Sequence, residues 1–251
     1  MRARLHPGVK VLIQIGCLFL PGIPAYLWLW PNVEGTPWLK PVQVLVYLYF
    51  LIGALVIGRQ RWNWQQLGFN RHGLGLSLIC GTVLVAGRML IMYSLKLPAS
   101  PNPIAFVGLI GDVIFYLVCV GLTEELLFRG VLYRALDEWH GARLAIWGSA
   151  LAFGLYHIGS QGVAGAIGTG FIGLILAAIR WRAGGIIGLI IAHGLLDITS
   201  AVMLPTLDVE QLVHISIARP MLLLLGYVLI LMVPIYLWKF YHPVNLKRRT
   251  T

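Results

Sequence analysis

Long apolar runs separated by short polar connections dominate the chain. Eight runs are long enough to be membrane-spanning helices, at about residues 11–30, 41–58, 74–95, 104–128, 143–159, 163–180, 185–203 and 220–239. A helix needs roughly 20 mainly apolar residues to cross the hydrocarbon core of a bilayer. The pattern therefore predicts an all-α, polytopic membrane protein with about eight transmembrane helices.

The connections between these runs are short, so residues 1–251 are expected to form a single transmembrane domain. The first run is not followed by a small-residue cleavage site, which favours a retained helix over a signal peptide. Pro21 and Pro24 should kink that helix. Residues 62–69 form a short amphipathic segment, which we expect to lie along the membrane interface.

Composition and charge agree with this interpretation. The chain is 59% hydrophobic and 11% charged, which excludes an ordinary soluble domain. A net charge of +10 could indicate nucleic-acid binding, but the basic residues are scattered among the connections. We therefore expect no nucleic-acid partner and attribute the charge to the positive-inside rule.

The eight-span topology divides the basic residues unevenly. The side of the termini carries Arg2, Arg4, Lys10, Arg59, Arg61, Arg71, Arg129, Arg134, Arg143, Arg180, Arg182, Lys239, Lys247, Arg248 and Arg249. The other side carries Lys40, Lys96 and Arg219, and Arg88 falls inside the third span. Cytoplasmic connections are enriched in Lys and Arg. Both termini are therefore predicted to be cytoplasmic, in a cell (plasma or inner) membrane, and the compact chain favours a bacterial source.

The sixth predicted span is rich in small residues at intervals of four. One stripe runs through Gly162, Ala166 and Gly170, and a second through Gly165, Thr169 and Gly173. Small residues allow neighbouring membrane helices to approach closely. We interpret both stripes as packing surfaces without chemistry.

Two adjacent glutamates extend an apolar run where charge is expensive. Glu124 and Glu125 are two of only nine acidic residues, and no Lys or Arg lies between Lys96 and Arg129. A charge at the centre of a bilayer costs about 2.5–3.5 kcal/mol on insertion scales. Such residues therefore usually have a partner or a function.

Polar residues enter three of the predicted spans. Two of these spans carry a polar pair four residues apart, which places both members on one helix face, and the third carries a histidine near its end. These are Glu125 with Arg129, His157 at the end of the fifth span, and His193 with Asp197 in the seventh. If the fourth and fifth helices form a hairpin at Gly141, Glu124 lies about 17 residues before the turn and His157 about 16 after it. The 1.5 Å rise per residue then puts both at one depth, in the cytoplasmic half of the membrane.

Each polar residue also has a purely structural interpretation. A single histidine in a membrane helix is often an interhelical hydrogen-bonding group. Glu125 and Arg129 could form a simple ion pair, and Asp197 could orient the ring of His193. Two histidines and three carboxylates from three helices nevertheless favour a shared polar site, surrounded by the transmembrane helices.

The chemistry open to such a site is limited. There is no G-x-S-x-G elbow and no cysteine close to a histidine in sequence, so a covalent nucleophile has no candidate. A carboxylate with two imidazoles can deprotonate water and stabilise an oxyanion. The same groups could instead bind a divalent metal, although the HExxH signature is absent.

These residues also form three recognisable motifs. Glu124–Arg129 fits EExxxR, Phe153–His157 fits FxxxH, and His193–Asp197 fits HxxxN/D. Their order and spacing resemble the CPBP family (CAAX protease and bacteriocin-processing, Abi-type) of intramembrane metalloproteases. The resemblance covers about residues 98–205, with spans over 11–95 and 220–239 flanking this core.

The resemblance implies a helical fold around a site open to the cytosol, and peptide-bond hydrolysis by glutamate-activated water. It implies Glu124 as general base, supported by Glu125, with His157 and His193 as metal ligands or oxyanion stabilisers. Asp197 would be a further ligand or would support one. The implied metal is Zn²⁺, with Glu124 as a further potential ligand, and Arg129 and Phe153 would have structural roles.

The leading hypothesis is thus an intramembrane endopeptidase that acts on a peptide or membrane-protein segment, with or without a lipid. A second hypothesis is a catalytically silent immunity or scaffold protein. A proton-coupled transporter is the third, and it is disfavoured because the polar residues gather at one depth instead of forming a path through the membrane.

Overall fold

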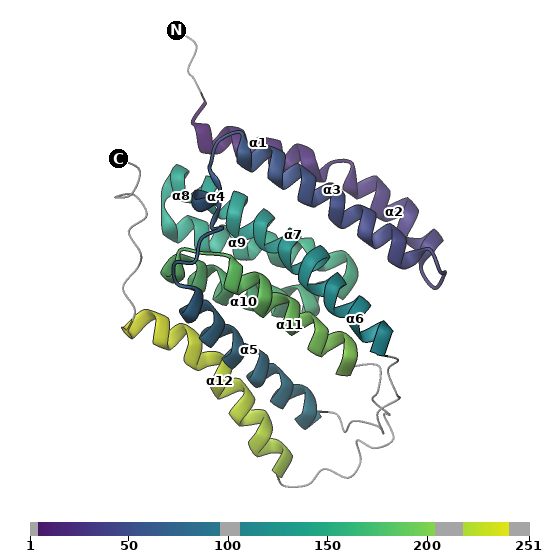
Figure 1. The fold of residues 1–251 in the computed structure, drawn as a ribbon, viewed down its shortest axis with the longest axis vertical. Coiled ribbons are helices and arrows are strands. Elements are labelled where there is room, and N and C mark those ends of the chain that lie inside the picture. Colours follow the sequence, from purple (N-terminus) through teal and green to yellow (C-terminus); the bar gives the residue numbers. More distant parts are fainter. Residues whose placement is uncertain (1–4, 96–105, 204–217, 241–251) are drawn as a thin grey trace.

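The computed structural model describes residues 5–95, 106–203 and 218–240, and these parts of the chain are helical throughout, with short turns between helices (Figure 1). This confirms the predicted all-α class. The elements are α1 (Pro7–Phe19), α2 (Gly22–Val33), α3 (Leu39–Arg59), α4 (Trp64–Leu67), α5 (Leu74–Leu95), α6 (Phe106–Ile114), η1 (Phe115–Gly121), α7 (Leu122–Glu124), η2 (Glu125–Leu132), α8 (Tyr133–His140), α9 (Ala142–Tyr156), α10 (Ile158–Ala183), α11 (Ile187–Met203) and α12 (Ala218–Phe240).

Four helices in the described ranges are long and apolar enough to cross a membrane. They are α3, residues Leu74–Met92 of α5, α10, and residues Pro220–Lys239 of α12. The other four predicted spans coincide with helical segments that are shorter, broken or of mixed type. The chain is therefore a helical membrane protein, and the count of eight spans stays a prediction.

The first predicted span shows why the length criterion fails for some segments. Helix α1 ends at Phe19 and α2 begins at Gly22, with Pro21 immediately before it. Proline lacks the N–H that would continue the hydrogen-bond ladder. The predicted kink at this point is confirmed as a break between two helices.

The helices lie in three groups. In Figure 1, α1–α3 run along one side, α5 and α12 along the other, and α6–α11 lie between them. Helix α3 packs against α7 and η2, while α5 packs against both α11 and α12. The central group, which carries the predicted motifs, is thus covered on both sides.

The central group contains an unusual helical run from Phe106 to His140. It changes from α to π geometry at η1, returns to α at α7, and changes again at η2. Glu124 ends α7 and Glu125 begins η2, so the two glutamates lie where the helix type changes. Single π turns are rare and occur frequently at functional sites.

The predicted hairpin between the fourth and fifth spans is confirmed. The run continues beyond the predicted end at 128 to His140, and α9 starts at Ala142. Gly141 makes the turn at φ 84°, a left-handed conformation that glycine adopts without a steric penalty. This hairpin brings the fifth predicted span back along the fourth.

One of the small-residue stripes packs as predicted. A Cβ atom on Gly154 of α9 would lie 2.8 Å from the carbonyl oxygen of Ala166 and 3.2 Å from Cα of Gly170. Gly173 similarly faces Phe153 and Arg129. Gly162 has another role, because its φ of 66° interrupts the helical geometry near the start of α10.

We expect Gly154→Ala to lower the free energy of unfolding by about 1–3 kcal/mol, because the added methyl would push against backbone. Gly168→Ala is the matched control, since its Cβ would meet nothing within 4 Å. Thermal unfolding of both variants in the same detergent tests the prediction. Equal melting temperatures for the two variants would contradict it.

Candidate functional site

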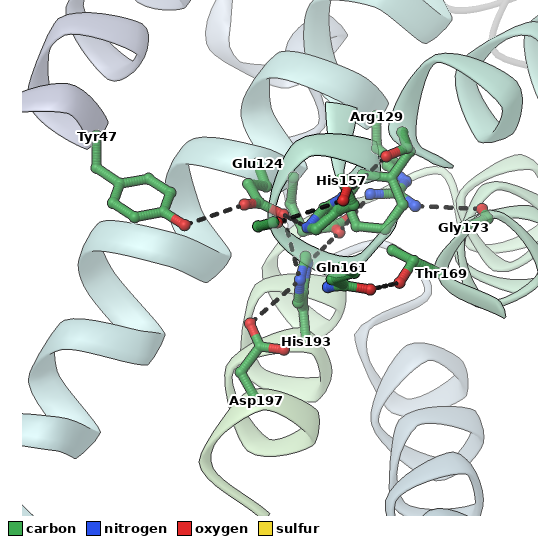
Figure 2. A network of polar contacts seen from close by, with 12 residues as sticks. Tyr47, Glu124, Arg129, His157, Gln161, Thr169, Gly173, His193 and Asp197 are labelled. Carbon is green, nitrogen blue, oxygen red and sulfur yellow. Dashed lines mark hydrogen bonds and ion pairs between the residues drawn. The ribbon is translucent and has the colours of Figure 1, made fainter. Parts of the chain in front are cut away.

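Glu124 lies at the centre of a buried polar cluster (Figure 2). Its side chain is 2% exposed, and its Oε2 atom lies 3.5 Å from Nε2 of His193 and 3.7 Å from Nε2 of His157. Oε2 is buried and has no hydrogen-bond partner among the residues that the structure describes. The structure thus brings Glu124, His157 and His193 together, and it places Glu124 level with His157, as the hairpin count predicted.

The ring of His193 is held between the two adjacent glutamates. Its Nδ1 lies 2.7 Å from Oε1 of Glu125, while its Nε2 faces Oε2 of Glu124. The same Oε1 accepts from Nη1 of Arg129, so Nδ1 of His193 is assigned as the donor in this contact. In the neutral ring, Nε2 is then the acceptor nitrogen.

His157 also uses its Nδ1 as a donor, but to a different partner. It follows the last residue of α9, and its Nδ1 lies 2.8 Å from the carbonyl oxygen of Phe153. A carbonyl oxygen can only accept, so Nδ1 donates and Nε2 is left as the acceptor. Both imidazoles therefore direct an acceptor nitrogen toward Glu124.

With both imidazoles neutral, three acceptors consequently converge on one point. These are Oε2 of Glu124 and the Nε2 atoms of His157 and His193. An unpaired buried polar atom such as Oε2 of Glu124 is costly, and two acceptor nitrogens facing it add to that cost. The arrangement is suited to a group that supplies positive charge or protons, either a water molecule or a cation.

Glu125 has two partners. Its Oε1 lies 2.8 Å from Nη1 of Arg129, which also donates from Nη2 to the carbonyl oxygen of Gly173 at 3.2 Å. The guanidinium carbon of Arg129 lies 4.2 Å from the ring centre of Phe153. Glu125 and Arg129 are fully buried, so the predicted ion pair is confirmed.

The orientation of His193 differs from one of the structural interpretations of the sequence. Asp197, one turn along α11, was a candidate to fix the ring through its N–H, but Glu125 makes that contact. Asp197 instead places Oδ2 3.4 Å from Nε2, on the same edge of the ring as Glu124. Its side chain is about one-third exposed (33%), so it lies where the cluster opens.

Aromatic rings surround the two histidines. Phe153 contacts the rings of both His157 and His193, with centroid distances of 4.7 and 5.6 Å. Tyr156 packs edge-on against His157 at 5.1 Å. These rings limit access of water to the cluster, which strengthens the electrostatic interactions inside it.

The donor set fits a divalent metal in chemistry. Metal-bound histidines usually donate their other ring N–H to a carboxylate or a backbone carbonyl. His193 and His157 show these two contacts, to Glu125 and to Phe153. Among the described residues, no group of three or more His, Cys, Asp or Glu side chains has the geometry of a complete metal site.

Sequence reasoning missed Tyr47 of α3. Its hydroxyl donates to Oε1 of Glu124 at 3.4 Å, from a residue 77 positions earlier in the chain. A tyrosine hydroxyl in a membrane span needs a partner, which is the one signal that could have singled it out. Several other tyrosines lie in the predicted spans, so that signal alone does not select Tyr47.

No curated protein and no solved structure matches the chain, but a protein-family model does. Residues 106–199 match the family described as type II CAAX prenyl endopeptidase Rce1-like. All three motifs and every residue of the polar cluster except Tyr47 fall inside this segment. Through this segment, the chain is similar to the CPBP family of CAAX-protease-like membrane proteins.

Proposed function

We propose that this protein is an intramembrane endopeptidase that hydrolyses a peptide bond with water activated by Glu124. The observation that carries the proposal is the convergence of three polar atoms, the buried Oε2 of Glu124 and the two Nε2 atoms, on one point. A water molecule held there would donate to Glu124 and lie within reach of a carbonyl carbon. The family match supports peptidase activity in general.

Glu124 has the proton-transfer role in this proposal. Its Oε2 accepts a proton as the water oxygen attacks the scissile carbonyl carbon, which forms the new C–O bond. The same oxygen then returns the proton to the leaving nitrogen as the C–N bond breaks. Glu125 holds the ring of His193 in place, and Arg129 stabilises Glu125 in turn.

We further propose that a divalent metal, Zn²⁺ as the first candidate, binds at the convergence point. His157 and His193 would hold it through Nε2, with Asp197 as a further carboxylate ligand, which would leave Oε2 of Glu124 to act as the base. A bound divalent cation would polarise the scissile carbonyl and make water a stronger acid. Neutral imidazoles with acceptor Nε2 atoms fit this role better than direct donation to an oxyanion.

Metal analysis tests this part separately from activity. His157→Ala and His193→Ala should each lower the zinc content of the purified protein at least tenfold, because each removes a ligand nitrogen. His140→Ala is the control, since His140 is exposed at the end of α8. Unchanged zinc content in both site variants would favour activation of water by Glu124 without a metal.

We also propose that both termini face the cytoplasm and that the site opens on that side. Arg129, Arg180 and Arg182 are buried within the helices and so do not act as interfacial charges. The remaining 12 basic residues on the side of the termini still outnumber the three on the other side. A reporter fused after Thr251 should therefore be cytoplasmic.

The proposed substrate is a peptide or a membrane-protein segment, and the family description points first to prenylated peptides. The test is to reconstitute the protein in liposomes and follow cleavage of quenched fluorescent peptides, one set farnesylated on cysteine and one without lipid. Cleavage by the wild type and none by Glu124→Ala supports the proposal. Equal cleavage by both proteins would remove it.

A further inference from the structure

Helix α3 lies outside the family-matched segment but borders the polar cluster. It packs against α7 and η2, the two elements that carry Glu124 and Glu125 (Figure 1). The match begins at residue 106, whereas α3 ends at Arg59. Any contact from α3 to the cluster is therefore supplied by a part of this chain to which the family match does not extend.

Tyr47 makes that contact. Its hydroxyl donates to Oε1 of Glu124 at 3.4 Å, and Figure 2 shows the ring directed from α3 toward the cluster. Thr123, which precedes Glu124 in the chain, donates from its hydroxyl to the carbonyl oxygen of Tyr47 at 3.5 Å. Two contacts thus join the same turns of α3 and α7.

The ring of Tyr47 is itself held in place. It packs edge-on against Phe115 of η1, with a centroid distance of 5.8 Å and an interplanar angle of 83°. A tyrosine has two main side-chain torsions, so a packed ring largely fixes the position of its hydroxyl. The hydroxyl is therefore a directed donor instead of a mobile one.

We propose that Tyr47 is a positioning residue for Glu124, an inference that rests on the proposed function. By donating to Oε1, the hydroxyl fixes the rotation of the carboxylate, so that Oε2 faces the Nε2 atoms of His157 and His193. The two oxygens of Glu124 thereby have separate roles: Oε1 is anchored to α3, and Oε2 is left for water.

The polar groups around Glu124 make this anchor useful. Glu125 and Asp197 repel its carboxylate, whereas the two histidines present acceptor nitrogens and Arg129 is engaged by Glu125. Without the Tyr47 hydroxyl as a donor to Oε1, the carboxylate of Glu124 can rotate so that Oε2 no longer faces the two histidines. Misplacement of a reacting group by about 1 Å can slow an enzymatic reaction by about 10²-fold.

The test is Tyr47→Phe, which removes the hydroxyl and keeps the ring against Phe115. Using the quenched fluorescent peptide that the wild type cleaves fastest, we expect kcat to fall roughly tenfold. KM and the melting temperature should stay at the wild-type values, because neither substrate contact nor packing changes. A purely structural role would lower the melting temperature and leave the kcat of the folded fraction unchanged.

The matched control is Tyr49→Phe, on the same helix. The Tyr49 hydroxyl donates to the carbonyl oxygen of Leu18 at 2.9 Å and does not reach the cluster. The Tyr49→Phe variant should therefore keep the wild-type kcat. An unaltered kcat in Tyr47→Phe, or an equal fall in both variants, would overturn the role of Tyr47 while Glu124→Ala remained inactive. Activity in Glu124→Ala would instead overturn the proposed function itself.

Discussion

Glu124→Gln is expected to slow peptide cleavage by roughly 10³-fold. Glutamine keeps the size and the hydrogen-bonding shape of glutamate but cannot accept the proton of water. Positioned general bases contribute about 10² to 10⁴ to enzymatic rates. The loss should appear in kcat, measured with the liposome assay, because the amide can still contact a bound substrate.

The control for this variant is Glu138→Gln on α8. Glu138 contacts Arg61 and Trp62 near the end of the helix and lies away from the cluster. Its replacement should leave kcat unchanged. Glu124→Gln should also melt at or above the wild-type temperature, since it removes an incompletely paired carboxyl group from a buried position. Wild-type kcat in Glu124→Gln would contradict the role of Glu124 as base.

Arg129→Ala is expected to give the largest loss of stability, about 3–5 kcal/mol in the free energy of unfolding. The change leaves the carboxylate of Glu125 buried without its cation, and breaking a buried pair from one side costs about this much. It also removes the bond to Gly173 and the stacking on Phe153. Thermal or denaturant unfolding in detergent measures the effect.

Two comparisons make the Arg129 prediction specific. Arg134→Ala removes an arginine whose contacts to Asp137 and Glu138 are longer, at 3.7 and 3.6 Å, and near the surface. It should cost about 1 kcal/mol or less. The double variant E125Q/R129Q removes both charges and should be more stable than Arg129→Ala. Equal losses for Arg129→Ala and Arg134→Ala would contradict a buried pair.

The part of the site that the sequence predicted rests on local counting. Glu125 and Arg129 are four residues apart, so a helix places them on one face whatever surrounds it. Glu124 and His157 lie at similar distances from Gly141, so a hairpin brings them level. Both predictions depend on the rise and repeat of one or two helices, and both are confirmed by the contacts.

The contacts that the sequence could not predict depend on how helices are rotated against one another. Helix α3 is apolar nearly all round, so its pattern does not indicate that Tyr47 faces Glu124. The π turns of η1 and η2 shift the direction of each following side chain relative to a regular helix. For this reason the sequence left open whether Asp197 or another group would orient His193.

Glycine and proline explain why hydropathy alone did not predict where each helix begins and ends. Gly162 interrupts α10 with a left-handed conformation, and Pro21 separates α1 from α2. A hydropathy pattern records the apolar run but not the break inside it. The predicted eight spans therefore describe where the chain is apolar more closely than where each helix is continuous.

Cleavage in ¹⁸O-labelled water tests whether Glu124 activates water for peptide hydrolysis. If Glu124 activates water for peptide hydrolysis, the new carboxyl group of the N-terminal product must carry one ¹⁸O atom, which mass spectrometry detects as a shift of about 2 Da. Glu124→Gln should yield almost none of this product over the same time. Products without ¹⁸O would show that water is not the nucleophile, and labelled products formed equally fast by Glu124→Gln would show that Glu124 is not the base.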